Sequence, residues 1–343
     1  MRRYRLRCVT IVGGAIAAAL TVGLPARMLL AQTTAGSCTV VPGTLAGADA
    51  CTKARDLFAF VLPQVGVALS GGNPILGEGG TAGGWGKIVA SARLSAVDGR
   101  LPKTAVPVRL SQTATADDFG TVRAPIPVPS VDAAIGVLKG IPLGLTNVGG
   151  VDALVSVTYV PSVAKGPVEL ATDGGNVAVG YGVRVGLLQE SALVPGIGVS
   201  WMRRSLPTLD LQFRGTNDTL AIRQLGVSSQ AIRLTASKRL LLVGLAAGVG
   251  QDRIDGTASV SAAVNESVGG SPQRAAVSLP SLRTRTVRNT AFVNASFSLL
   301  IARLVGELGW SSAGAIEQTT NRFSSRQANE AYGYGSVGLT LRF

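Results

Sequence analysis

The sequence NVAVGYGVRVGL, residues 176–187, alternates between two kinds of side chain with a period of two. Its odd positions are all Val, Tyr or Leu, whereas Asn176, Arg184 and three glycines occupy even positions. Successive side chains of a β-strand point to opposite faces of the sheet, so this pattern predicts a strand with one apolar and one small or polar face. The same alternation recurs around residues 197–201, 209–213, 291–299 and 303–311. These repeats predict an all-β protein.

Alternation alone does not distinguish a β-barrel in a lipid bilayer from a soluble β-domain. The composition favours the barrel, because 46% of the residues are hydrophobic, only 15% are charged, and 44 are glycine. A secreted soluble domain is usually less apolar, whereas a barrel in lipid carries its hydrophobicity on alternate positions. Beyond the N-terminal region, no charge-free apolar run approaches the roughly 18 residues of a membrane-spanning helix.

Long and short connections alternate along the chain, as external loops and periplasmic turns do in outer-membrane barrels. Lys238-Arg239 and Leu300-Ile301 are expected to be tight turns, and residues 264–282 and 312–331 long polar loops. We expect an antiparallel transmembrane β-barrel of about 12 strands, with ten or fourteen as alternatives. The expected strands are residues 86–96, 104–112, 121–137, 151–160, 177–188, 196–205, 208–222, 229–238, 240–258, 287–299, 302–314 and 332–343.

The first residues have the layout of a signal peptide. Residues 1–7 carry four arginines and no acid, and the charge-free apolar stretch 9–24 follows them. We expect residues 1–31 to be removed on export, so that Gln32 starts the mature chain; a retained membrane helix is the alternative. Removal of this segment and its five arginines lowers the formal charge from +13 to +8.

Export also bears on the cysteines. Cys8 lies in the expected signal peptide, which leaves Cys38 and Cys51 in the mature chain. Disulfides form in oxidising compartments such as the periplasm, so we expect these two residues to be bonded to each other, with two free thiols as the alternative.

Residues 32–85 differ from the rest of the chain and are expected to form a periplasmic or lumen-plugging segment, with the barrel at residues 86–343. Residues 52–62 have helical periodicity, and Gly71-Gly72-Asn73-Pro74 is a turn signal. The order of a cysteine-bearing segment, a short helix, a Gly-Asn-Pro turn and a barrel resembles the outer-membrane long-chain fatty-acid transporter family. That resemblance rests on residues 50–80 and implies an N-terminal segment that plugs the lumen.

The chain ends with SVGLTLRF, residues 336–343. Its terminal phenylalanine resembles the C-terminal β-signal of outer-membrane proteins, with Phe343, Leu341 and Gly338 on the motif positions. The resemblance implies assembly by the barrel-assembly machinery and a place in the bacterial outer membrane. A terminal strand of a soluble β-domain is the alternative.

Several kinds of chemistry are disfavoured by the sequence. The chain contains no histidine, so catalytic arrangements and metal sites that depend on histidine are excluded. Asp252 and Asp255 form a carboxylate pair, but turn residues are the simpler interpretation. The arginines are scattered singly and do not form a basic stripe, which disfavours nucleic acid as a partner. We expect no enzymatic activity and no cofactor.

Charged residues on the polar face would point into the lumen. The expected residues are Arg93, Arg184, Arg204, Arg214, Arg233, Arg303, Arg342, Asp210 and Glu307. An arginine-rich lumen favours anions, but the arginines can equally pair with lumen acids or with lipopolysaccharide phosphates. We therefore expect a pore or transporter for small or hydrophobic solutes. The alternatives are a structural or adhesive barrel with a filled lumen, and a secreted soluble β-domain.

Overall fold

The computed structural model describes residues 48–102, 116–160, 162–165, 168–214, 218–268, 271–316, 320–325 and 329–343. The expected signal peptide, Cys38 and the strand expected at 104–112 lie outside these ranges. Within them, no helix combines the length and the apolar character needed to cross a bilayer.

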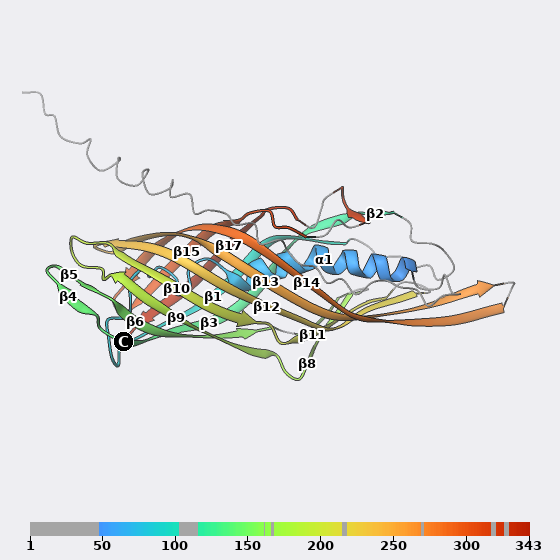
Figure 1. Cartoon of the computed structure of the whole chain (residues 1–343), viewed down its shortest axis with the longest axis horizontal. Helices are drawn as coiled ribbons and strands as arrows, with labels where there is room; N and C mark the ends of the chain where they lie inside the picture. Colours follow the sequence, from blue (N-terminus) through green and yellow to red (C-terminus); the bar gives the residue numbers. More distant parts are fainter. Residues whose placement is uncertain are drawn as a thin grey trace, which may run out of the picture. The chain divides into compact units, whose positions relative to one another are not determined.

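Ten antiparallel strands of the described chain close into a ring (Figure 1). Each pairs with its neighbours in chain order, and the first strand pairs with the last to complete the circuit. The ring strands are β1 (Ile88–Pro102), β3 (Thr121–Leu138), β6 (Gly150–Tyr159), β9 (Val177–Leu188), β10 (Gly196–Ser205), β12 (Asp218–Leu240), β13 (Val243–Val268), β14 (Ser271–Leu299), β15 (Ala302–Ser311) and β17 (Tyr332–Arg342). The antiparallel barrel class is therefore confirmed, with ten strands in the ring in place of the preferred twelve.

The expected strand count was too high partly because β10 does not turn back after Ser205. Residues 208–214 form β11 (Thr208–Arg214), and β10 and β11 both pair antiparallel with β12. They are therefore successive parts of one strand path. In place of the second expected turn, β12 has an irregularity between Arg223 and Gly226, where Gln224 has a φ of 52°. A bulge bends a strand without reversing it.

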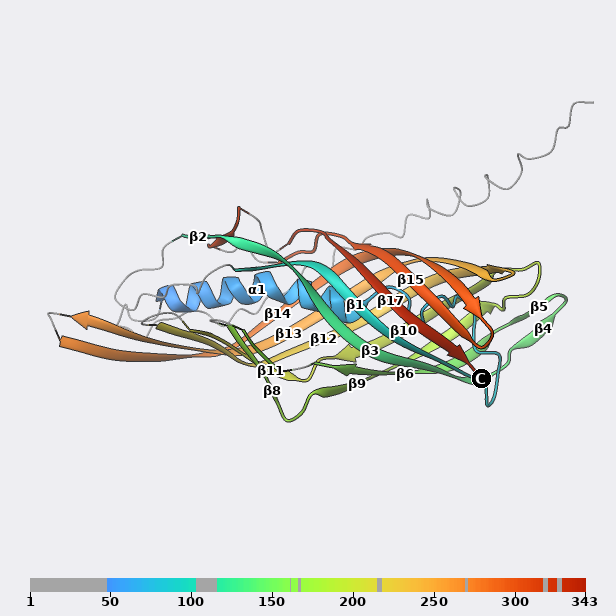
Figure 2. The ribbon, with the colours of Figure 1, turned by 180° about the vertical axis from the view of Figure 1, so that it is seen from behind.

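Part of the sheet continues beyond the ring on one side (Figures 1 and 2). Three short strands continue the paths of β6, β9 and β10: they are β7 (Val163–Lys165), β8 (Val168–Asp173) and β11. The strands β12, β13 and β14 contain 23, 26 and 29 residues, whereas a barrel strand needs only about 9–11 residues to cross a bilayer. We call this part of the sheet the extension. Residues 264–282, expected as a loop, lie mostly in the paired β13–β14 hairpin.

The opposite end of the ring carries the tight turns and the C-terminus. Leu241 and Leu242 join β12 to β13, and Leu300 and Ile301 join β14 to β15. The second turn is as predicted, while the first lies three residues after the expected Lys238-Arg239, which are still in β12. A small hairpin at the same end comprises β4 (Ile141–Leu143) and β5 (Thr146–Val148).

The two faces of the ring strands differ as the alternation predicts. On β9, Val179 and Val183 are 63% and 40% exposed, whereas Arg184 between Val183 and Val185 is 3% exposed. Outward apolar side chains recur on the other ring strands, including Val131, Val157, Leu234, Leu245, Val293, Leu304, Leu308 and Val337. Because ring closure satisfies the backbone groups on both edges of each ring strand, this apolar belt suits a lipid environment.

One helix, α1 (Ala48–Ser70), lies inside the curved sheet, with strands on all sides of it. It extends four residues before and eight residues after the expected helical patch 52–62. Leu57, Phe58 and Leu62 are at most 2% exposed and belong to the main hydrophobic cluster, together with Ile254 of β13. Gly71 ends the helix with a φ of 57°, and its N–H donates to the carbonyl of Val67 at 3.1 Å, a left-handed termination that glycine favours.

Candidate functional site: the plugged lumen

The segment after α1 fills the lumen between the helix and the rim. We call residues 71–82 the plug loop, and α1 with the plug loop the plug; all of residues 71–82 are buried. Glycines let the loop backbone pack directly on the barrel wall. A Cβ atom at Gly79 would lie 2.6 Å from the backbone nitrogen of Ser237, and one at Gly72 would lie 2.7 Å from the Phe292 ring.

Arginines of the wall donate hydrogen bonds to backbone carbonyls at the end of α1 and in the plug loop. Arg233 of β12 donates from Nη2 to the carbonyl of Gly71 at 2.9 Å and from Nε to that of Gly72 at 3.1 Å. Arg204 donates to the carbonyl of Ser70 at 2.7 Å, and Arg93 to that of Asn73 at 2.8 Å. A loop buried away from water needs such partners, because unpaired backbone groups are costly there. The guanidinium, with several donors in one plane, can serve two acceptors at once.

Each of these arginines also has a carboxylate partner. Asp132 lies 2.9 Å from both Arg93 and Arg204, and Asp252 lies 2.6 Å from Arg233. Two more pairs follow the same plan: Arg184 with Asp152 at 2.7 Å, and Arg303 with Glu78 of the plug loop at 2.8 Å. Both partners of each pair are nearly inaccessible to solvent. A buried ion pair needs further hydrogen bonds to offset desolvation. Plug carbonyls supply them to Arg93, Arg204, Arg233 and Arg303, and the N–H of Ala82 supplies one to Asp152.

Carboxylates of the wall hold the N–H groups of the plug loop. Glu307 of β15 accepts hydrogen bonds from the backbone nitrogens of Gly72 and Asn73 at 3.1 and 2.8 Å, and also from the side chain of Asn294 at 2.8 Å. Asp152 accepts from the backbone nitrogen of Ala82. The plug therefore contacts the wall through both carbonyl and N–H groups, which fixes its path through the lumen.

The N-terminal half of α1 is covered by two connections between ring strands. Phe60 stacks on Phe323 with ring centroids 4.5 Å apart, and Asp56 accepts from the backbone nitrogen of Asn321 at 2.7 Å. Phe323 lies in β16 (Arg322–Phe323), which pairs with β2 (Asp118–Phe119). We call this pairing of β2 and β16 the cover. Beside it, hydrogen bonds from the backbone N–H and the hydroxyl of Ser325 hold the pKa of Asp118 below its ordinary value.

The structure places most of the expected lumen residues on the inner face of the ring. The buried ones are Arg93, Arg184, Arg204, Arg233, Arg303 and Glu307. Arg342, partly exposed at the rim, donates to the carbonyls of Thr81 and Ala82 at 3.2 and 3.3 Å.

Two expected lumen residues lie elsewhere. Asp210 and Arg214 are on β11, in the extension, and the Asp210 carboxylate accepts from the backbone nitrogen of Gln224 at 2.8 Å. The assignment of Asp210 to the lumen was wrong because the alternation continues past the end of the ring, where the inner face of the sheet no longer encloses a lumen. The side chain of Arg214 is not described.

Sequence reasoning placed Asp152 in the lumen but missed two other acids that pair with the arginines, Asp132 and Asp252. Asp252 was expected in a turn, but it is buried in β13, inside the ring. Its inner-face position follows the even-numbered series Ala246, Gly248 and Gly250 that precedes it, so extending the alternation along β13 would have found it. Asp132 lies in β3, which was expected as a strand at 121–137 although three prolines interrupt its alternation. Pro125, Pro127 and Pro129 all lie on β3 opposite β1 in a regular register.

The C-terminal residues close the ring. The backbone N–H of Phe343 donates to the carbonyl of Ile88 at 2.9 Å, and the N–H of Ile88 donates back at 3.2 Å. Gly338 lies opposite Arg93, and a Cβ atom there would lie 2.4 Å from the carbonyl oxygen of Ala92. Gly338 therefore has a packing reason to be glycine, apart from the assembly signal that the sequence resembles.

No protein-family model and no curated protein matches the sequence. Among solved structures, the chain is similar to the outer membrane protease OmpT from Escherichia coli, at 11% identity and a TM-score of 0.34, over 75% of this chain and 97% of that one. It is also similar to the β-domain of the Bordetella autotransporter BrkA, at 10% identity and a TM-score of 0.31, over 74% and 98% of the two chains. An anion-selective porin from Comamonas acidovorans matches at 12% identity and a TM-score of 0.17, over 75% and 98%. Similarity this low says nothing about activity or substrate.

Proposed function

We propose that this chain is a bacterial outer-membrane barrel that is closed to passive flux by its own plug and has a structural or adhesive role. The observation that carries the proposal is the set of hydrogen bonds from wall arginines to plug carbonyls. Arg204 and Arg233 alone bind three consecutive carbonyls, those of Ser70, Gly71 and Gly72. A conducting pore needs a continuous water-filled path, and the plug occupies that path.

The contacts also favour a plug that stays in place. A hydrogen bond to a charged group contributes about 1.5–3 kcal/mol, and releasing the plug would break several of them at once. It would also leave Arg233 and Glu307 buried with fewer partners. The plug is therefore a stable part of the folded barrel.

The extension supports a role outside the membrane. In outer-membrane barrels the short turns face the periplasm and the longer connections face outward, so we place the extension outside the cell. Arg253, Arg283 and Arg285 are exposed where β13 and β14 pass from the ring into the extension, and Asp255 pairs with Arg253 and Arg285 at 3.1 and 2.5 Å. The basic excess suits contact with lipopolysaccharide phosphates, while the sheet itself offers a surface for adhesion.

A transporter of hydrophobic solutes is the second candidate. It is favoured by the place of Asn73-Pro74, because the resemblance to the fatty-acid transporter family implies an Asn-Pro motif in a lumen plug. Asn73 is 1% exposed, and its side chain donates to Asn294 at 3.0 Å. Transport through this barrel would require the plug to move, whereas the first candidate does not.

Planar-bilayer conductance of the refolded full-length chain tests the proposal. We expect no stable open-channel current from the wild type. In the double variant Arg233→Met/Asp252→Asn, two plug carbonyls lose their donors without leaving an unpaired charge, so channel openings should appear.

The matched control is Arg253→Met/Asp255→Asn, which removes an exposed pair on the other face of β13 and should stay silent. Stable porin-like conductance from the wild type would instead support the pore. Uptake of a labelled hydrophobic solute by wild-type vesicles, without ionic conductance, would support the second candidate.

A further inference from the structure

A cavity of about 770 Å³ lies at the tight-turn end of the ring. We call it the vestibule. Its walls come from the plug loop, from the β9–β10 connection and from the ends of the neighbouring strands. The polar part of the wall includes Glu78, Glu190, Arg239, Arg303, Thr340 and Arg342. Leu241, Leu242, Leu300 and Ile301 of the two tight turns form its apolar edge.

The charges around the vestibule are not balanced. Three arginines and two glutamates line it. Glu78 pairs with Arg303 at 2.8 Å, and Glu190 pairs with Arg239 at 3.2 Å. Arg342 forms no direct ion pair with a carboxylate of the described residues; it donates to the carbonyls of Thr81 and Ala82, and its charge also acts on Glu78, which is already paired with Arg303. One positive charge is therefore left over at the mouth of the barrel.

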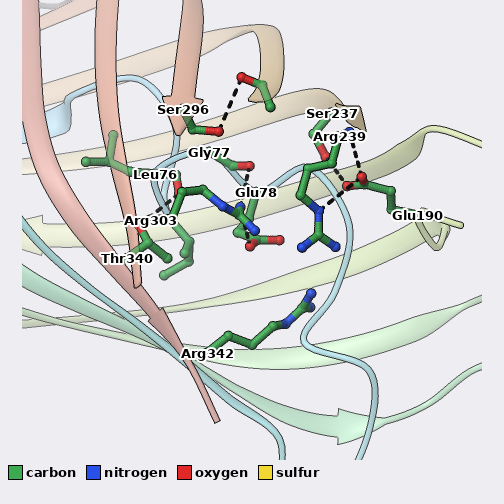
Figure 3. A network of polar contacts seen from close by, with 12 residues as sticks. Leu76, Gly77, Glu78, Glu190, Ser237, Arg239, Ser296, Arg303, Thr340 and Arg342 are labelled. Atoms are coloured by element: carbon green, nitrogen blue, oxygen red, sulfur yellow. Dashed lines mark hydrogen bonds and ion pairs between the residues drawn. The ribbon is translucent and has the colours of Figure 1, made fainter. Parts of the chain in front are cut away.

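Hydrogen-bond donors are left over as well. Arg239 uses its backbone nitrogen and Nε on Glu190, so neither of its Nη groups has a partner among the described residues. Arg303, whose side chain is 8% exposed, has a buried Nε with no partner in the same part of the chain. Figure 3 shows Arg239 and Arg342 reaching toward each other across the opening, with Glu78 to one side.

Two guanidinium groups that face each other repel unless an anion lies between them. The planar donor fork of arginine matches the two oxygens of a carboxylate or phosphate. The geometry points to an oxyanion site in the vestibule, in which Arg239 and Arg342 bind a carboxylate- or phosphate-bearing ligand that enters from the tight-turn side. The apolar edge suits a ligand that carries a nonpolar group beside its anionic group.

This inference is independent of whether the barrel conducts, because the vestibule lies on the tight-turn side of the plug loop and is closed by it. It places a binding function at the end of the barrel away from the extension. If that end faces the periplasm, the ligand comes from the periplasm.

Calorimetric titration of the refolded full-length chain in detergent tests the site. Inorganic phosphate, acetate and the soluble short-chain lipid dihexanoyl phosphatidic acid are titrated separately at low ionic strength. Binding of phosphate or acetate would show that a free oxyanion is enough to occupy the site. Binding of the phosphatidic acid alone would show that the site recognises a lipid headgroup. Either result supports the site, and no binding of any of the three overturns it.

Variants locate the binding. Arg239→Met and Arg342→Met should each weaken it at least tenfold. Arg253→Met should leave it unchanged, because Arg253 has a similar exposure, 43% against 35% for Arg239, but lies outside the vestibule. Equal binding by wild type and the double variant Arg239→Met/Arg342→Met, with both in the heat-modifiable folded form, overturns the assignment.

A measurement on the wild type covers the case in which the variants do not fold. Phenylglyoxal modifies accessible arginines, and mass spectrometry identifies the modified residues. The ligand that binds should protect Arg239 at least fivefold and leave the modification of Arg253 unchanged. Unaltered modification of Arg239 at saturating ligand contradicts the site.

Discussion

Arg233 of β12 and Asp252 of β13 form an ion pair of 2.6 Å, and the same guanidinium donates to the carbonyls of Gly71 and Gly72. Asp252 also accepts a hydrogen bond from Thr290 of β14. The pair therefore links three strands of the wall to the plug. Neither side chain is exposed by more than 2%, so the pair is stable only as long as all its partners are present.

The pair predicts a difference between single and double variants. Arg233→Met leaves Asp252 buried without its cation and should lower the free energy of unfolding by about 3–5 kcal/mol. Arg233→Met/Asp252→Asn removes both charges and should cost less than the single change. Urea unfolding in lipid vesicles, followed by tryptophan fluorescence, measures both. A double variant less stable than Arg233→Met would show that the Asp252 carboxylate contributes more through its hydrogen bond with Thr290 than its unpaired charge costs.

The outward face of β9 predicts where an arginine is tolerated. Val183 is in the middle of β9 and faces outward, so Val183→Arg should lower the free energy of unfolding in vesicles by roughly 2–4 kcal/mol. Val122, also exposed, lies near the end of β3 that leads to the cover. Val122→Arg should cost about 1 kcal/mol or less, as expected near an interface. Equal costs at the two positions would contradict the lipid-facing belt.

Phe343 allows its ring and its backbone to be tested apart. Deleting Phe343 removes the ring and also the hydrogen bonds with Ile88, whereas Phe343→Ala removes only the ring. If the assembly machinery recognises the terminal ring, both variants should reach the outer membrane in reduced amounts. Heat-modifiable gel migration of the membrane fraction measures the folded protein. Normal levels of Phe343→Ala with low levels of the deletion would assign the effect to the backbone pairing.

The disulfide remains a prediction, because Cys51 lies on α1 and Cys38 is outside the described residues. A bond between Cys38 and Cys51 closes a short loop and should stabilise the exported chain by about 3 kcal/mol. Mass spectrometry of the native protein after alkylation should find neither thiol modified. Two alkylated cysteines in the folded protein would rule the bond out.

The orientation of the barrel predicts opposite accessibility for its two ends. With the tight turns in the periplasm, a cysteine at Ser325 in the cover should react with a membrane-impermeant maleimide on intact cells, and one at Leu241 should react only after the outer membrane is permeabilised. Both positions are exposed in the structure. The unsubstituted chain is the control for the native cysteines. The reverse labelling pattern would place the extension in the periplasm.

By itself the sequence determined the barrel class and the two faces of its strands. The side chains of a strand alternate with a period of two, so Val183 and Arg184 had to point to opposite sides. The apolar side then belongs in lipid. The Gly-Asn-Pro turn and the helical patch before it likewise indicated a separate N-terminal segment.

Only the tertiary structure decided the strand count and the partners of the charges. The chain between Ser205 and Thr208 continues in one direction because β10 and β11 both pair with β12. The residues before and after this point cannot show that pairing by themselves. Asp252 reaches Arg233 across neighbouring strands, and Glu307 reaches the backbone of Gly72 from 235 residues away. Such contacts depend on strand register and ring closure, which local sequence patterns do not specify.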